Sequence, residues 1–144
     1  MKDRVFVDSD VILDVVIGRE RFYESSALFL SLVENRNILG FTSPIVISNI
    51  HYIARKELKN ATKAKSIIKT IMEILSVLSV NETNLETALN QDFPDFEDSI
   101  QYTIAIENKI DTIVTRNTKD YKRSKLKVFT PEDYLLANAS RVIV

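Results

Sequence analysis

Three aspartates interrupt an apolar run close to the start of the chain. The stretch VFVDSDVILD carries Asp8, Asp10 and Asp14 among aliphatic and aromatic residues. A carboxylate beside a hydrophobic strand must be solvated, paired with a cation or bound to a metal, because burial without a partner is very costly. The stretch therefore indicates a polar site next to a buried strand.

Three further groups of residues could supply chemistry to such a site. They are the acids Asp95, Glu97 and Asp98, the polar segment 115–120, and Asn49 near the start of a predicted helix. Hard divalent ions such as Mg²⁺ bind oxygen ligands, and they usually take a few carboxylates while keeping several waters. Such ions can activate water for attack on a phosphodiester and stabilise the leaving oxygen. The groups suit metal-dependent hydrolysis if the fold brings them together.

Other polar residues in these stretches have ordinary structural explanations. Asp14 follows Asp10 by one helical turn and is expected to lie on the surface or to cap a helix. Asp95 is expected to cap a helix, and Glu97 is expected to face solvent. His51 is the only histidine and has no acid within reach by sequence. A histidine-based mechanism therefore has little support.

Charge is segregated along the chain although the net charge is only −1. Segment 82–98 holds six acids and no lysine or arginine, whereas segment 116–127 holds six bases and one acid. Solvated helix faces and loops explain such runs, and so does a surface that grips a phosphate backbone. Arg116 lies beside the candidate site, where it would contact a substrate phosphate or be a surface cation.

The composition is that of a globular chain. Its 144 residues are 45% hydrophobic and 27% charged, which suits one domain with a hydrophobic core. The absence of cysteine excludes disulfides, thiol nucleophiles and zinc thiolate sites. The first segment does not match a secretory signal, and no apolar stretch is long enough to span a membrane. A cytoplasmic protein without membrane contact is expected.

Patterns typical of strands and helices alternate along the chain. Short strands are predicted at 4–8, 38–42, 76–80, 111–115 and 127–130. Helices are predicted at 22–35, 43–58, 62–75, 81–89, 95–110 and 130–137, with one more after the first strand. The expected N-caps are Ser9, Ser43, Asn81 and Thr130.

This alternation predicts an α/β protein. Strands joined by helical crossovers form a mostly parallel central sheet flanked by helices, here a three-layer fold in a single domain over 1–144. Ligands of such sheets bind beyond the carboxyl ends of the strands. Asp8 ends the first strand, and Thr115, Arg116 and Asn117 end another. The candidate site therefore draws on at least two strand ends.

The first stretch alone resembles the haloacid-dehalogenase-like phosphatases. In that family Asp8 would be the nucleophile and Asp10 the general acid. The family then needs a strand-end threonine, a lysine and a further strand with paired acids. Thr115 could be the threonine, but only 29 residues follow it, and their only adjacent acids, at 132–133, belong to a capping sequence. The resemblance therefore stops at the first stretch.

Four stretches that cover nearly the whole chain match another family in order and spacing. They are VFVDSDVILD, TSPIVISNIHYIARK, DFEDSIQYTIAIENKIDTIVTRNTKDY and VFTPEDYL. Together they resemble the PIN domain, the metal-dependent ribonuclease fold of VapC-type toxins from toxin–antitoxin pairs. A lone D-x-D is a weak signal, but four stretches in one order are a strong one.

The resemblance implies roles for individual residues. Asp8 matches the first metal-binding aspartate, Asp98 the aspartate opening the helix before the last buried strand, and Asp120 the acid of a T-R-N-x-x-D element. These three would be catalytic and would hold Mg²⁺ or Mn²⁺. Thr115 matches the hydroxyl residue of that element. Asp10 occupies a position where many members carry asparagine.

Two positions depart from the fullest version of the family site. Asn49 stands where such members have a glutamate, and Asn117 stands where they have an aspartate. An amide can still offer a carbonyl oxygen or orient water, but each replacement removes one negative charge. Both residues are expected to support a site that holds one metal, with a second metal weaker or absent.

The resemblance implies a metal-dependent endoribonuclease, the toxin of a toxin–antitoxin pair. Its partners would be RNA, a cognate antitoxin that masks the cleft, and a second copy in a homodimer. The alternative is a catalytically weak PIN-like domain that binds RNA or a protein, since Asn49 and Asn117 replace acids. The expected discriminator is whether Asp8, Asp98 and Asp120 converge at one edge of the sheet.

Overall fold

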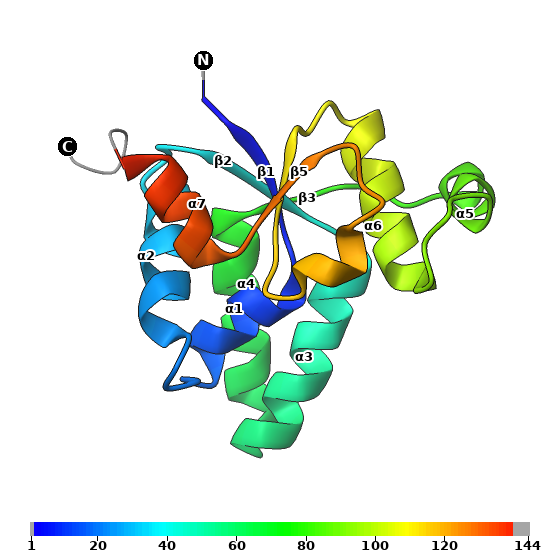
Figure 1. The fold of residues 1–144 in the computed structure, drawn as a ribbon. Coiled ribbons are helices and arrows are strands. Elements are labelled where there is room, and N and C mark those ends of the chain that lie inside the picture. Colours follow the sequence, from blue (N-terminus) through cyan, green and yellow to red (C-terminus); the bar gives the residue numbers. More distant parts are fainter. Residues whose placement is uncertain (1, 140–144) are drawn as a thin grey trace.

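The computed structural model describes residues 2–139, so residue 1 and residues 140–144, the two ends of the predicted 1–144 domain, lie outside it. Five strands form one sheet: β1 (Arg4–Val7), β2 (Leu39–Thr42), β3 (Ser76–Val77), β4 (Thr112–Val114) and β5 (Lys127–Phe129). The helices are α1 (Ser9–Val16), α2 (Tyr23–Glu34), α3 (Pro44–Leu58), α4 (Ala61–Ile74), α5 (Glu82–Leu89), α6 (Phe96–Glu107) and α7 (Pro131–Ala137), with a 3₁₀ turn η1 (Thr118–Tyr121) (Figure 1).

The strand order is β3-β2-β1-β4-β5, and every pairing is parallel. Strand β1 lies at the centre, with Phe6 opposite Phe41 of β2 and Ile113 of β4. Val5, Phe6 and Val7 are fully buried, as expected for a central strand covered on both faces. The predicted parallel sheet is confirmed.

Helices pack in two groups around this sheet. Helix α1 packs on α2 and α3, α2 on α7, and α3 on α4, whereas α5 packs on α6. The chain runs outward from β1 to β3 and then returns to β4 on the other side of β1. Right-handed crossovers therefore place α1–α4 on one face and α5–α6 on the other. The three-layer α/β class predicted from the sequence is confirmed.

Most predicted helix caps are observed. The side chains of Ser43, Asn81 and Thr130 each accept a hydrogen bond from the amide three residues later, which satisfies a free N–H of the first turn. Ser9 was expected to cap the first helix, and that expectation is wrong. The helix begins at Ser9, and the carboxylate of Asp8 accepts from the Ser9 amide at 2.8 Å.

Strand β3 is shorter than the predicted 76–80. It pairs only with β2, which ends at Thr42, and the last bond between them runs from the Leu78 amide to the Thr42 carbonyl at 2.9 Å. Beyond that point the chain has no neighbouring strand to continue the ladder. Of the helices within residues 2–139, none is both long and apolar enough to cross a membrane.

Candidate active site

The predicted site residues meet at the carboxyl ends of two neighbouring strands. Asp8 follows β1 and Thr115 follows β4, and these strands pair with Val7 opposite Val114. A cleft of about 160 Å³ lies there. Its lining includes six of the residues predicted for the site: Asp8, Asp10, Asn49, Asp98, Asn117 and Asp120.

Asp8 is held at the base of the cleft by hydrogen bonds to both carboxylate oxygens. Its Oδ1 accepts from the Ser9 amide, and its Oδ2 lies 3.0 Å from Thr115 Oγ1 and 3.4 Å from the Tyr121 hydroxyl. Its own amide donates to the Val114 carbonyl at 3.0 Å. Only 8% of the residue is exposed. The end of β1 and the first turn of α1 thus fix the direction of this carboxylate.

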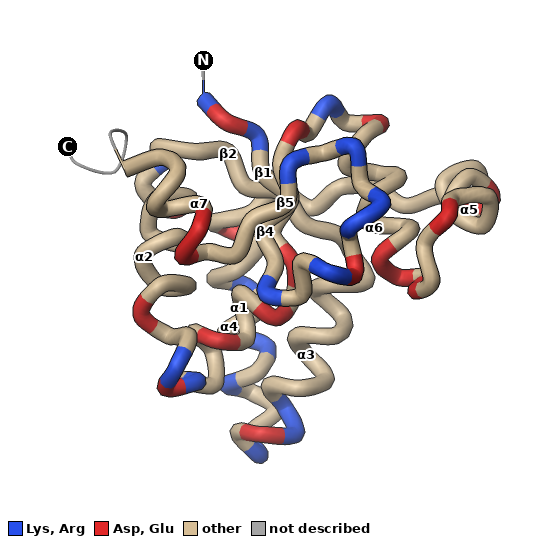
Figure 2. The backbone as a smooth tube through the Cα atoms, viewed as in Figure 1, with Lys and Arg blue, Asp and Glu red and all other residues tan. Residues whose placement is uncertain are grey.

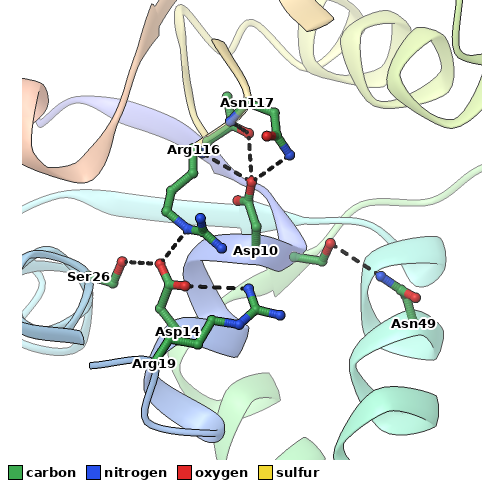
Figure 3. A network of polar contacts seen from close by, with 9 residues as sticks. Asp10, Asp14, Arg19, Ser26, Asn49, Arg116 and Asn117 are labelled. Carbon is green, nitrogen blue, oxygen red and sulfur yellow. Dashed lines mark hydrogen bonds and ion pairs between the residues drawn. The ribbon is translucent and has the colours of Figure 1, made fainter. Parts of the chain in front are cut away.

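Asp10 ties the segment after β4 to helix α1. Its Oδ2 accepts from the amide of Arg116 and from Nδ2 of Asn117, each at 3.1 Å, and lies 3.3 Å from Thr115 Oγ1 (Figure 3). Its other oxygen, Oδ1, is buried with no hydrogen-bond partner among the described residues. Such an orphaned oxygen is costly unless a cation or water completes its contacts.

Asp98 enters the cleft from the first turn of α6. Asp95 caps this helix, as predicted, by accepting from the Asp98 amide at 3.0 Å. The Asp98 side chain accepts from the Tyr121 hydroxyl at 3.2 Å. Glu97 is exposed, as expected, and lies at the cleft margin. Helix α6 therefore directs Asp98 toward Asp8, with Tyr121 in contact with both.

Tyr121 is a site residue that the sequence does not predict. It closes the η1 turn and is 1% exposed, and its hydroxyl contacts both Asp8 and Asp98 while receiving a hydrogen bond from Gln101 Nε2 at 3.1 Å. The hydroxyl thus lies within hydrogen-bonding distance of two carboxylates, and its single hydrogen can donate to either of them. Its ring packs edge-on against Phe93 at 6.0 Å. No spacing rule marks such a residue, because its role depends on how a short 3₁₀ turn folds back over the sheet.

The remaining predicted residues occupy the cleft margin. Asp120 is exposed and lies on η1 next to Tyr121. The side-chain amide of Asn49 donates to Ser9 Oγ at 3.3 Å, and that of Asn117 donates to Asp10 (Figure 3). The structure therefore brings all the predicted acids to one cleft, with Asp120 the most exposed of them.

Burial and mutual repulsion disfavour the charged forms of these acids. Burial is the largest cause in each case: it raises the pKa of Asp8, and with the charge of Asp8 it raises the pKa of Asp10 to about 6. The pKa of Asp98 rises to about 7 through burial and the charges of Asp95 and Asp8. Burial and the neighbouring carboxylates also raise the pKa of the Tyr121 hydroxyl. The cleft holds more negative charge than its own donors neutralise.

These shifts predict that the metal-free protein loses stability as the pH rises. Because the pKa of Asp98 is about 7 in the folded state and has an ordinary value of 3.8, the folded state binds more protons between these values, so the free energy of unfolding falls with rising pH. Replacing Asp98 by asparagine removes this contribution. In EDTA, Asp98→Asn should become progressively more stable than wild type between about pH 5 and about pH 8 in urea titrations.

Asp111→Asn is the matched control for this experiment. Asp111 is exposed and precedes β4, at the end of the strand opposite to Thr115. Any dependence on pH that is specific to the cleft should be absent from its difference from wild type. A constant difference for Asp98→Asn as well would contradict the raised pKa.

The donors in the cleft fit a hard divalent ion. They are carboxylate and amide oxygens, and Asp10 Oδ1 has no partner among residues 2–139. Within the same residues no three acidic or histidine side chains are already gathered as a complete metal cage. Magnesium-like ions need no such cage, because they bind through one or two carboxylates and keep several waters.

Asp14 lies behind the cleft together with the Arg116 side chain, and its position corrects an expectation. Asp14 is fully buried, neither a surface residue nor a cap. Its Oδ2 accepts from Arg116 Nε at 2.9 Å and from Ser26 Oγ at 2.8 Å, and its Oδ1 lies 3.5 Å from Arg19 Nη1 (Figure 3). The Arg116 guanidinium also stacks on the Phe22 ring at 4.0 Å. Arg116 is therefore a fixed, partly buried cation.

Basic and acidic segments are adjacent in the folded chain. Figure 2 shows the basic residues of segment 116–127 along the connection from β4 to β5, next to the acidic start of α6. Arg123 forms an ion pair with Asp92, which joins the basic run to the acidic one. The arrangement fits the predicted surface with cations beside an acidic cleft.

The fold and the cleft define an α/β protein with clustered carboxylates at the ends of its central parallel strands, a set of donors whose chemistry fits a divalent cation. A family model for the PIN domain matches residues 4–119. The chain belongs to the PIN domain family, as the four sequence stretches predicted.

Proteins of the VapC type are among its relatives. Ribonuclease VapC1 of Aquifex aeolicus (strain VF5) is 29% identical over 139 residues, which cover 92% of this chain and 93% of that protein. Among solved structures, PAE2754 from Pyrobaculum aerophilum has a TM-score of 0.66 at 16% identity, covering 97% of this chain and 98% of that one. A toxin–antitoxin complex from Klebsiella pneumoniae has a TM-score of 0.65 at 18% identity, covering 88% and 97%. The structural matches establish a shared fold.

Proposed function

We propose that this protein is a metal-dependent endoribonuclease and the toxin of a toxin–antitoxin pair. The observation that carries the proposal is the convergence of Asp8, Asp10, Asp98 and Asp120 on one cleft of a PIN domain. The relative named as a ribonuclease supports the activity. The fold shared with a toxin–antitoxin complex supports an antitoxin partner. Assembly as a homodimer stays a prediction from the family resemblance.

Asp8, Asp98 and Asp120 would hold Mg²⁺ or Mn²⁺, with Asp10 adding negative charge. A divalent ion supplies two things to this chemistry: a more acidic attacking water and neutralisation of charge on the phosphate. The protein contributes the placement of its own groups. Thr115 and Tyr121 fix the direction of the Asp8 carboxylate through its Oδ2. Carboxylates held in this way need little rearrangement when a cation enters.

The basic residues beside the cleft would bind the RNA backbone. The backbone amide of Arg116 donates to Asp10 at the cleft. Its guanidinium donates to Asp14 on the far side of the same segment. Cations next to a cluster of acids allow a polyanion to approach a site that would otherwise repel it. The terminal nitrogens of Arg116 have no protein acceptor within residues 2–139, and we assign this residue to binding a substrate phosphate on the far side of the segment.

The test is cleavage of single-stranded RNA by the purified protein. Cleavage is expected with Mg²⁺ or Mn²⁺, with a loss of at least about a hundredfold in EDTA, because metal-assisted activation of water accounts for several kcal/mol of the barrier. Excess Mn²⁺ should restore the rate. Cleavage that ignored EDTA would overturn the proposed mechanism.

The same assay decides between the enzyme and a binding module. Asn49 and Asn117 donate their amide groups to Ser9 and Asp10, so each holds a neighbour and adds no charge to the cleft. If the protein bound RNA tightly but cleaved none with either ion, the module would be the correct description. Mn²⁺ binding measured by calorimetry would then show whether the cleft still takes a cation.

A further inference from the structure

A second cavity lies behind the acidic cleft. It has a volume of about 230 Å³, and its lining includes Arg21, Phe22, Ser25, Arg116 and Glu132. Arg116 connects the two sites, since its amide donates to Asp10 in the cleft while its side chain lines this cavity. One residue of the segment after β4 therefore takes part in both sites.

The Arg116 guanidinium is fixed with part of its donor capacity unused. Asp14 binds its Nε, and the Phe22 ring lies 4.0 Å from its central carbon. Within residues 2–139 its two terminal nitrogens donate to no protein acceptor at hydrogen-bonding distance. An arginine held on one edge and one face presents its remaining donors in a defined direction, which suits an oxyanion.

Arg21 brings a second cation to the same ring. Its guanidinium lies 5.5 Å from the centre of Phe22, and the side chain forms no ion pair within the described part of the chain. Two like charges around one ring repel each other unless an anion lies near both. Ser25 adds a hydroxyl and, in the first turn of α2, a backbone N–H that has no helical acceptor.

Glu132 limits the charge that the cavity accepts. Together with Arg21 and Arg116 it leaves one net positive charge on the lining, and the ion-paired Asp14 and Arg19 next to Arg116 cancel each other and do not change this balance. That balance matches the single negative charge of an internal phosphodiester better than the double charge of a terminal phosphate. The cavity is also next to a cleft to which we assign cleavage of RNA.

We propose that the cavity between Arg21, Ser25 and Arg116 binds a backbone phosphodiester of the RNA substrate, next to the one that is cleaved. This inference rests on the proposed function, because it requires RNA in the adjacent cleft. It adds a distinct binding site, built on α2 and the segment after β4. Arg21 is the residue that tests it, since it touches neither the cleft nor Asp14.

The experiment compares Arg21→Gln with Arg36→Gln, which removes an exposed arginine near the other end of α2. RNA binding is measured in EDTA by fluorescence anisotropy over a range of salt concentrations. Arg21→Gln should weaken binding about threefold to tenfold at low salt and lower the salt slope by about 0.7, the loss of one phosphate contact on a single strand. Arg36→Gln should change neither quantity.

Cleavage kinetics provide a second readout. Arg21→Gln should raise KM for an oligonucleotide while kcat stays close to wild type, because the lost contact is remote from the reacting phosphate. For a dinucleotide, which has one phosphodiester and cannot occupy both sites, wild type and Arg21→Gln should behave alike. A KM effect of equal size on both substrates would overturn the proposal.

The failures of the two proposals can be told apart. If wild type cleaves RNA and Arg21→Gln matches Arg36→Gln in affinity and salt slope, the second site is wrong while the enzyme stands. If wild type neither binds nor cleaves RNA, both are wrong. If Arg21→Gln loses binding of polyglutamate and keeps full affinity for RNA, the cavity serves a protein carboxylate and the proposal is overturned.

Discussion

Replacing Asp8 by asparagine is expected to lower RNA cleavage by about a hundredfold to a thousandfold, because the proposed metal site would lose its most buried charged ligand. The fold should survive. Asparagine has the same shape, and its single oxygen can still accept from the Ser9 amide, as Asp8 Oδ1 does at 2.8 Å. The hydroxyls of Thr115 and Tyr121 can reorient to accept from the new amide group. Cleavage rates with Mn²⁺ and thermal unfolding check the two expectations.

Asp111→Asn serves as the matched control for Asp8→Asn. It makes the same chemical change at an exposed aspartate outside the cleft lining, so activity and stability should both stay near wild type. Binding of Mn²⁺, followed by calorimetry, should weaken for Asp8→Asn only. An Asp8→Asn protein that is folded and cleaves at the wild-type rate would rule out this carboxylate as a catalytic ligand.

The convergence of the acids could be predicted from the sequence because it depends on topology. Parallel strands joined by helices end at one edge of the sheet, so residues that follow two such strands meet there. Asp8 and Thr115 illustrate this, since they follow paired strands and lie in hydrogen-bonding contact at 3.0 Å. The same reasoning applies to Asp98. Helix α6 leads into the start of β4, so it begins at the edge of the sheet where the parallel strands end.

The partners of buried polar groups could not be predicted in this way. Asp14 was expected on the surface because one turn of helix separates it from Asp10, and sequence spacing does not show what covers that face. Both partners of its Oδ2 are distant in the sequence: Ser26 is 12 residues away and Arg116 is 102 residues away. Tyr121 was missed for the same reason: its hydroxyl lies 113 residues from Asp8 and 23 from Asp98. Contacts of this length depend on the completed fold.

Two acids of α1 hold Arg116 from opposite ends. Asp10 binds its amide at the cleft, and Asp14, one turn later, binds its side chain on the far side (Figure 3). The spacing of four residues places both acids on the same side of α1, where each can bind a different part of Arg116. It fixes the segment after β4, and with it Thr115, against helix α1. The position of the cleft thus depends on a buried ion pair outside it.

Replacing Asp14 by alanine is expected to destabilise the protein by about 2–3 kcal/mol. Breaking a fully buried ion pair costs about 3–5 kcal/mol. The expected cost lies at or below the lower end of that range, because the side chains of Arg116 and Arg19 are 21% and 35% exposed and regain some solvation. Ser26 also loses the acceptor of a buried hydrogen bond. Urea unfolding at neutral pH measures the loss.

Asp92→Ala is the control, since it breaks an ion pair on the surface. The side chain of Asp92 is 82% exposed and that of its partner Arg123 is 61% exposed. A pair in that setting contributes about 0–1 kcal/mol, so Asp92→Ala should lie near wild type. Asp14→Ala should in addition weaken RNA binding in EDTA, because Arg116 loses the contact that directs its guanidinium toward the second cavity. If Asp14→Ala cost no more than Asp92→Ala, the buried network would not be what holds the segment after β4 in place. The direction of Arg116 would then have to come from its stacking on Phe22 alone.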